Sequence, residues 1–226
     1  LDHGREIYSP ILPDMTGYSD SEKVEKFEFD LEKAKETLRD AGWKEEGGEL
    51  KKDGQALEIS LVTTDWPPLQ KTPDILKAQW EKAGIKTNIE SLSISDIQQN
   101  YIRPREYEAL LFGQSWVGIQ ADPFPLWHSS QTKDPGLNLA LYSNKDADKE
   151  MEEIREETVQ DEQMKNYEKF QEMLTDDIPA LFVYSPNHIY VTNRKIQGIG
   201  VQSAVASQER FSDVTSWYVK TKRVRK

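Results

Sequence analysis

The chain has 226 residues, which is enough for one large domain or for one domain and part of a second. Its formal net charge of −11 opposes binding to nucleic acid and to anionic membrane surfaces, because those partners require concentrated lysine and arginine. Cysteine is absent, so the sequence excludes disulfides, thiol catalysis and cysteine-based zinc or iron–sulfur sites.

The first predicted helix follows a connecting segment. Residues 1–20 contain proline and glycine without a sustained hydrophobic period, which is typical of a connector. After Asp30, a good N-cap, apolar residues recur at helical spacing, and Gly42 supplies the left-handed position beyond the helix. Leu38 and Trp43 then occupy the two positions whose side chains meet in a Schellman motif. We therefore expect an amphipathic helix that Trp43 closes.

A β-α-β unit comes next. Two glycine-containing turns after Trp43 predict a short polar hairpin. Residues 57–61 alternate as one strand face, residues 70–83 carry apolar positions at helical spacing, and residues 85–89 alternate again. Gly84 ends the helix directly before the second strand, so we expect the two strands to be parallel neighbours.

A second helix and strand follow this unit. Ser95 and Gln98 have the spacing of a capping box, with Ile94 in the staple position, and the helix is expected to run to about Ile102. The short apolar run over residues 107–112 is typical of a buried strand.

The remaining chain begins with an irregular stretch. Residues 116–145 contain proline, glycine and asparagine without periodicity, and a long irregular segment inside a compact domain is usually functional. Helices are predicted over residues 146–157 and 161–176, the second with Gln171 in register with its apolar positions. Further strands are expected at residues 180–184, 189–192 and 214–219.

Five segments resemble one known family, in the family's order. Residues 27–43 combine an aromatic pair, an Asp-x-x-Lys-Ala start and an Ala-Gly-Trp end, and residues 112–123 contain a Trp followed by Asp-Pro. The others are residues 9–18, 142–148 and 178–184. Together they resemble the family 5 solute-binding proteins of ABC importers, the dipeptide- and oligopeptide-binding type. The resemblance covers nearly all of this chain, but only about the C-terminal half of a family protein.

The resemblance implies a fold and a role. The fold would be a periplasmic-binding-protein-like α/β lobe, with a mixed β-sheet flanked by helices and a segment that belongs to the other lobe. Residues 1–20 would be a connector at the hinge, residues 21–186 the solute-binding lobe, and residues 187–226 the return segment. Closure of two lobes would capture a small solute, either an oligopeptide or an oligosaccharide, for delivery to ABC permease subunits.

Other expectations concern the partners and the place of action. We expect no nucleic-acid partner, no cofactor, no metal and a monomer. The protein would act outside the cytoplasm, either in the periplasm or lipid-anchored on the outer face of the cytoplasmic membrane. Its signal would then lie upstream of Leu1.

The resemblance also indicates a ligand cleft. Residues 112–123 leave a predicted strand, and ligands favour the crevice at the carboxyl ends of strands in open α/β sheets. By resemblance, Trp116 would form part of the cleft wall; the alternative is an ordinary core aromatic. Trp66 follows another strand end and offers an aromatic platform. The expected ligand-binding residues are Trp116, Val117, Gly118, Ile119, Trp66, Tyr142 and Tyr184.

One position departs from the family pattern. Peptide-binding relatives commonly have an Asp three residues after this Trp, where it pairs with the amino terminus of the peptide, and here the residue is Ile119. An aliphatic side chain cannot replace that charge-assisted bond. A peptide with a free amino terminus is therefore not the default ligand. Asp122 is an alternative partner, but an Asp-Pro pair favours a turn.

Catalysis has no positive signal in the sequence. The histidines His3, His128 and His188 lie far apart, none in an HxH or HExxH spacing, and neither standard phosphate-binding loop is present. We therefore predict a binding protein and not an enzyme. Two alternatives stay open: a hydrolase domain that uses paired carboxylates, and a non-catalytic interaction or sensor domain on the same fold.

Overall fold

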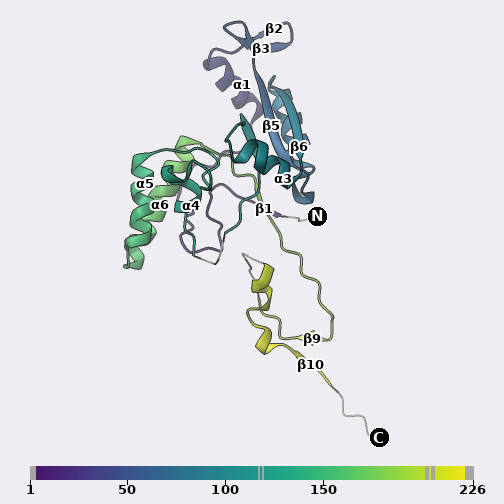
Figure 1. The fold of residues 1–226 in the computed structure, drawn as a ribbon, viewed down its shortest axis with the longest axis vertical. Coiled ribbons are helices and arrows are strands. Elements are labelled where there is room, and N and C mark those ends of the chain that lie inside the picture. Colours follow the sequence, from purple (N-terminus) through teal and green to yellow (C-terminus); the bar gives the residue numbers. More distant parts are fainter. Residues whose placement is uncertain (1–3, 117, 119, 202–203, 205–206, 222–226) are drawn as a thin grey trace. The chain divides into compact units, whose positions relative to one another are not determined.

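A computed structural model of the chain describes residues 4–116, 118, 120–201, 204 and 207–221 (Figure 1). The described residues divide into two compact units. Unit 1 is drawn from Leu1–Glu25, Gln114–Phe124 and Asn144–Lys226, and unit 2 from Lys26–Gly113 and Pro125–Ser143. Both units contain helices and strands, so the chain is of the mixed α/β class. Among the described residues, no helix combines the length and apolar character that a membrane span requires.

Unit 2 begins with the helix that the sequence predicts. Helix α1 spans Leu31–Asp40, and the Asp30 side chain accepts a hydrogen bond of 2.9 Å from the backbone of its first turn. At the other end Gly42 has a φ of +93°, and the Trp43 N–H donates to the Leu38 carbonyl at 3.0 Å. This is the backbone pattern of a Schellman motif, which confirms the predicted helix end.

A small antiparallel meander follows α1. Strands β2 (Lys44–Glu46), β3 (Glu49–Lys52) and β4 (Gln55–Ala56) pair in order. Gly47 and Gly48 have positive φ at the first turn, as Asp53 and Gly54 have at the second. Positive φ at both central residues gives the hairpin turn whose twist matches its strands, so the predicted turns are confirmed.

A three-stranded parallel sheet forms the centre of unit 2. Its order is β6-β5-β7, with β5 over Glu58–Thr64, β6 over Lys86–Leu92 and β7 over Ala109–Leu111. Helix α2 (Thr72–Lys82) connects β5 to β6 and packs against β6. Gly84 has a φ of +89° just before β6, which confirms the tight crossover that the sequence predicts. Strand β7 is half-buried and shorter than expected.

The next helix begins two residues earlier than predicted. Helix α3 spans Ile94–Ile97 and continues as a π-helical turn over Gln98–Ile102. Its N-cap is Ser93, whose backbone is extended and whose hydroxyl accepts the Asp96 N–H at 3.2 Å. The predicted cap at Ser95 is therefore wrong, because Ser93 already has the extended geometry and Asp96 stands three residues on.

Unit 1 contains two long helices and an N-terminal segment. Helices α5 (Lys145–Glu156) and α6 (Gln160–Asp177) pack side by side (Figure 1), close to their predicted bounds. The Asn144 side chain caps α5 by accepting two backbone hydrogen bonds. The most deeply buried apolar side chains of the pair are Ala147, Met151, Ile154, Tyr167, Phe170 and Leu174.

The later strands of unit 1 differ from those that the sequence predicts, and of the predicted strand over residues 180–184 only Tyr184 lies in a strand. Strand β1 (Gly4–Glu6) pairs antiparallel with β8 (Tyr184–Pro186), and β9 (Ile196–Gln197) pairs with β10 (Tyr218–Val219). The predicted strand over residues 189–192 is wrong, since those residues are irregular. The stretch from 214 is a short 3-10 turn before β10. Strand propensity does not form a strand without a partner to pair with.

Candidate functional site

Trp116, one of the expected ligand residues, lies in unit 1. Its side chain is half-buried, and its indole Nε1–H donates to the Pro10 carbonyl at 2.9 Å. Gly118 follows with a φ of +82° and open space where a Cβ would stand. Val117 and Ile119 lie outside the described residues. The hydrogen bond fixes the Trp116 ring edge to the N-terminal segment.

The far end of the same loop is attached to the N-terminal segment as well. Thr16 and Gln120 form an isolated parallel bridge, and the Ala121 N–H donates to the Thr16 carbonyl at 3.3 Å. The Tyr167 hydroxyl on α6 donates to the Ala121 carbonyl at 2.5 Å. The loop from Trp116 to Ala121 is thus held at both ends.

Asp122 closes this loop with an ion pair at the surface. Its two carboxylate oxygens accept hydrogen bonds from Arg155 at 3.0 and 2.7 Å, and one of them also accepts the Phe124 N–H at 3.3 Å. The Arg155 guanidinium lies 3.9 Å from the centre of the Phe124 ring. A bidentate pair with a local backbone bond is the arrangement of a turn, which agrees with the turn that Asp-Pro predicts.

The remaining expected residues are distributed over the two units. Tyr184, in unit 1, is half-buried at the start of β8, opposite Glu6 of β1. Trp66, in unit 2, is 41% exposed and follows the end of β5, with Gly113 close to its ring. An exposed indole beside a glycine leaves one ring face accessible to a ligand.

Tyr142 is a core residue of unit 2. It is only 6% exposed, and a fully buried Asn138 holds its backbone through Tyr142 N–H to Oδ1 (3.1 Å) and Nδ2–H to the Tyr142 carbonyl (2.9 Å). The same Nδ2 donates to the carbonyls of Trp127 and His128. Trp127 itself is 2% exposed, so it packs in the core and offers no ligand platform.

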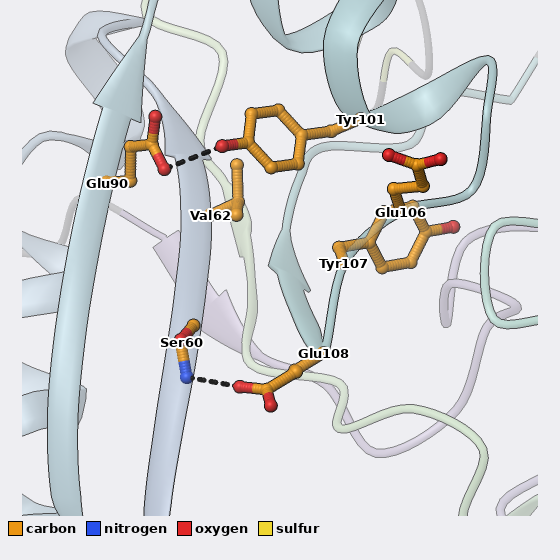
Figure 2. A pocket seen from close by; sticks show the side chains of 7 residues that line it. All are labelled: Ser60, Val62, Glu90, Tyr101, Glu106, Tyr107 and Glu108. Atoms are coloured by element: carbon orange, nitrogen blue, oxygen red, sulfur yellow. Dashed lines mark hydrogen bonds between the residues drawn. The ribbon is translucent and has the colours of Figure 1, made fainter.

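Sequence reasoning missed an open pocket of about 360 Å³ on the polar face of the parallel sheet (Figure 2). Three carboxylates and two tyrosines line most of it. The Tyr101 hydroxyl donates to Glu90 at 2.7 Å, which raises the pKa of Tyr101, and Glu108 accepts the Ser60 N–H at 2.8 Å. Burial raises the pKa of Tyr107. The lining residues are Ser60, Val62, Glu90, Tyr101, Glu106, Tyr107 and Glu108.

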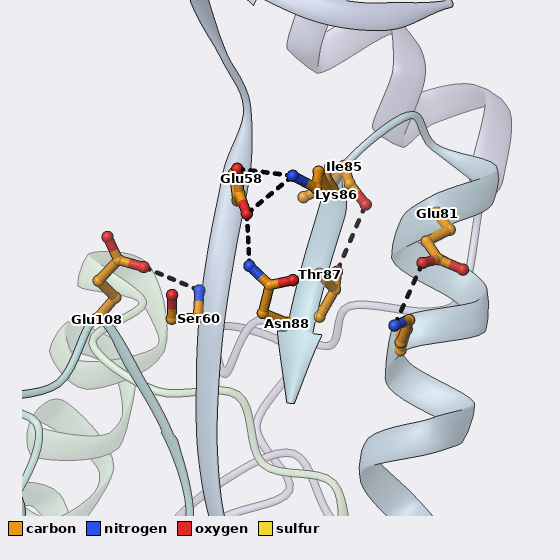
Figure 3. Close-up of polar contacts among 9 residues, drawn as sticks. Glu58, Ser60, Glu81, Ile85, Lys86, Thr87, Asn88 and Glu108 are labelled. Atoms are coloured by element: carbon orange, nitrogen blue, oxygen red, sulfur yellow. Dashed lines mark hydrogen bonds and ion pairs between the residues drawn. The ribbon is translucent and has the colours of Figure 1, made fainter. Parts of the chain in front are cut away.

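The polar face continues from this pocket towards the start of β5 and β6. Glu58 accepts hydrogen bonds from Asn88 and, at 3.1 Å, from Lys86 (Figure 3). The Asn88 amide, and after it Lys86, hold the pKa of the Glu58 carboxyl below its usual range. Among the residues that the structure describes, no group of three or more His, Cys, Asp or Glu could hold a metal ion. On this face Glu58 is paired with a charge, Lys86, while Glu90 and Glu108 accept hydrogen bonds from neutral groups.

Comparison with known proteins decides the family. The family model of bacterial extracellular solute-binding proteins, family 5 Middle, matches residues 1–138. The chain belongs to this family. Family 5 consists of solute-binding proteins, so membership agrees with the prediction of a binding protein and not an enzyme.

Individual relatives agree with the family 5 assignment. The oligopeptide-binding protein AppA of Bacillus subtilis is 29% identical over 199 residues, which are 86% of this chain and 36% of that protein. The heme-binding protein A of Haemophilus influenzae is 27% identical over 183 residues, 78% of this chain and 31% of that protein. The chain thus spans about a third of the length of these curated relatives.

A solved structure agrees as well. AppA from Bacillus subtilis, in complex with a nonapeptide, superposes with a TM-score of 0.79 at 26% sequence identity. The match covers 97% of this chain and 43% of the AppA chain. The fold of this chain therefore corresponds to part of a family 5 receptor.

Proposed function

We propose that the chain is the C-terminal part of an extracytoplasmic receptor that captures an oligopeptide and delivers it to an ABC importer. The observation that carries this proposal is the family 5 match over residues 1–138. A peptide is proposed as the ligand because the relative AppA is named for oligopeptides and was solved with a nonapeptide. The partners would be the permease subunits of the importer, and the receptor would be a monomer outside the cytoplasm.

In this proposal the chain supplies one lobe and a segment of the other. Residues 1–20 connect the lobes at the hinge, residues 21–186 form the solute-binding lobe, and residues 187–226 return to the first lobe. Closure of the two lobes buries the ligand. The chain by itself then lacks one wall of the cleft and binds peptide weakly, in the millimolar range or not measurably by calorimetry.

The ligand wall of this lobe is the loop that starts at Trp116. Its support is local geometry: a half-buried indole with its edge tied down, then Gly118 with open space above its backbone. Backbone groups beside an open glycine can pair with an extended peptide, and an indole offers an apolar face to varied side chains. Trp66 and Tyr184 are further candidates, whereas Tyr142 is the weakest of the expected residues because its side chain is buried and its backbone N–H and carbonyl pair with Asn138.

The proposal is tested by nuclear magnetic resonance (NMR), which detects weak binding. The ¹⁵N-labelled chain is titrated with a library of random nonapeptides with acetylated amino termini, because the sequence has Ile119 where a free amino terminus would need an acid. The indole resonance of Trp116 is assigned from its absence in Trp116→Phe. We expect this resonance to shift, and Trp116→Ala to weaken binding about tenfold or more, as truncation of an aromatic anchor does. The control Trp43→Ala removes a half-buried indole that follows α1 and should leave binding unchanged. Equal losses in both variants, or no shift, would contradict the proposal.

A further inference from the structure

Gln171 on α6 is a buried polar residue with every hydrogen-bonding position used. It is 0% exposed, and its Oε1 accepts from the Ser9 hydroxyl at 2.8 Å and from the Ser19 N–H at 3.4 Å. Its Nε2 donates to the carbonyls of Gly17 and Tyr167, each at 2.9 Å. An amide side chain offers two donors and one oxygen acceptor, so this set satisfies it completely. The N-terminal segment is therefore fixed to α6 at three residues.

The contact between Gln171 and Ser9 leads directly to Trp116. The Ser9 hydroxyl, which donates to Gln171, also accepts the Ile11 N–H at 3.2 Å. Between these residues stands Pro10, whose ring restricts its own φ. The Pro10 carbonyl accepts the Trp116 indole N–H at 2.9 Å. Gln171 on α6 therefore holds Ser9, which precedes Pro10, and the Pro10 carbonyl in turn holds the ring edge of Trp116.

Tyr167, one turn before Gln171, fixes the other end of the loop. Its hydroxyl donates to the Ala121 carbonyl, and its ring fills the space beside Gly17, where a Cβ would stand 2.7 Å from the ring. Tyr167 is 0% exposed. One turn of a single helix therefore holds both ends of the loop from Trp116 to Ala121.

We infer that Gln171 and Tyr167 are positioning residues that hold the Trp116 loop ready for ligand before any ligand binds. The inference rests on the proposed function for the ligand role of Trp116, but the attachment itself can be measured without ligand. A side chain that is fixed in advance loses less conformational entropy on binding, so attachment of Trp116 raises affinity although Gln171 and Tyr167 do not touch the ligand. A residue with a purely structural role would instead lower the stability of the whole unit and leave Trp116 unaffected while the protein stays folded.

The test compares Gln171→Met with Ser9→Ala, a milder change that cuts the same path, and with Met151→Ala. Gln171→Met keeps the length of the side chain and removes its hydrogen bonds. Met151 is fully buried on α5 and takes no part in the attachment, so its variant controls for lost stability. Hydrogen exchange of the Trp116 indole N–H is measured without ligand, at a temperature where each variant is folded.

We expect exchange at Trp116 to become about tenfold faster or more in Gln171→Met and Ser9→Ala, because the protecting carbonyl is no longer held, and to stay unchanged in Met151→Ala. Unchanged exchange in the first two variants, or equal acceleration in the control, overturns the positioning role. Titration with the nonapeptide library then separates the two claims. If exchange rises but neither Gln171→Met nor Trp116→Ala loses affinity, the ligand role of the loop fails, whereas no binding by the unchanged chain means that the proposed function fails. If only Trp116→Ala loses affinity, the positioning role alone fails.

Discussion

The β5-α2-β6 segment of unit 2 and the N-terminal segment over residues 9–19 of unit 1 are both well ordered, but for different reasons. In the first, seven consecutive residue pairs join β5 to β6, so each position is supported by its neighbours. In the second, strand pairing is almost absent, and buried side chains from α6 supply the hydrogen bonds. Order without regular secondary structure depends on a few individual side chains.

This difference predicts where single substitutions matter most. A ladder of backbone hydrogen bonds survives most side-chain changes, because the backbone groups stay in place. A segment held by one amide and one ring loses several contacts when either is changed, and buried polar groups left unpaired are costly. The irregular segments should therefore be more sensitive to substitution than the sheet.

The largest effect is expected for Gly17→Ala. Its φ of +98° disfavours any side chain, and the new Cβ would meet the Tyr167 ring at 2.7 Å. Left-handed strain and overpacking together should lower the free energy of unfolding by about 2–5 kcal/mol. The control Gly48→Ala has a φ of +86° with open space, so it should lose only about 1 kcal/mol. Urea unfolding measures both, and similar losses would mean that the Tyr167 contact adds nothing.

Asn138→Ala should have the next largest effect. The substitution removes the hydrogen bonds that Asn138 makes to the buried carbonyls of Trp127, His128 and Tyr142 and to the Tyr142 N–H. We expect a loss of about 2–3 kcal/mol in the free energy of unfolding. Asn88→Ala, which removes an exposed amide from Glu58, is the matched control and should change stability by less than about 0.5 kcal/mol. A loss for Asn138→Ala as small as that of its control would contradict this account of the irregular segment.

The regular part of the fold could be predicted from the sequence because its signals are local. Alternating residues, a helical period and Gly84 were enough to predict two parallel strands joined by a helix. The attachment of residues 9–19 joins positions more than 150 apart in sequence, and no local period reports such contacts. One signal was present: Gln171 stands on the apolar face of α6, where a polar residue needs buried partners.

Tyr167→Phe should have a moderate, pH-dependent effect. Loss of the hydroxyl bond to Ala121 should cost about 0.5–1.5 kcal/mol at neutral pH. Burial raises the pKa of Tyr167 above the ordinary tyrosine value. The stability that the protonated hydroxyl contributes is therefore fully present below the ordinary tyrosine pKa, and it is lost as the pH rises through the higher pKa of the folded state. The variant should therefore lose less stability between pH 9 and 11, as seen in urea unfolding at stepped pH. If Tyr167→Phe lost as much unfolding free energy between pH 9 and 11 as the unchanged chain, the prediction would be contradicted.

The smallest effect concerns the start of α3. Ser93→Ala removes the hydroxyl that accepts the Asp96 N–H and should cost about 0.5–1 kcal/mol, the low end for an exposed cap. Ser95→Ala changes the residue that sequence spacing favours and should have almost no effect on thermal unfolding. A larger loss of stability for Ser95→Ala than for Ser93→Ala would show that Ser95 is the cap.

The two serines and the later strands show why some predictions failed. Ser93 and Ser95 both have an acidic or amide residue three positions on, so spacing alone could not choose between them. Residues 189–192 have strand propensity, yet Ile189 and Val191 are 74% and 86% exposed. A strand depends on a partner, and that partner is not encoded in the segment itself.

The central claim is that the loop from Trp116 contacts a peptide ligand, and intermolecular nuclear Overhauser effects (NOEs) test it most directly. The isotope-labelled chain is mixed at millimolar concentration with unlabelled random nonapeptides, and NOEs between the chain and peptide protons are recorded. We predict NOEs from the Trp116 ring to the peptide and none from the buried Trp127 ring. Peptide NOEs confined to Tyr101 and Tyr107, which line the acidic pocket of unit 2, or a complete absence of NOEs at Trp116, would contradict the claim.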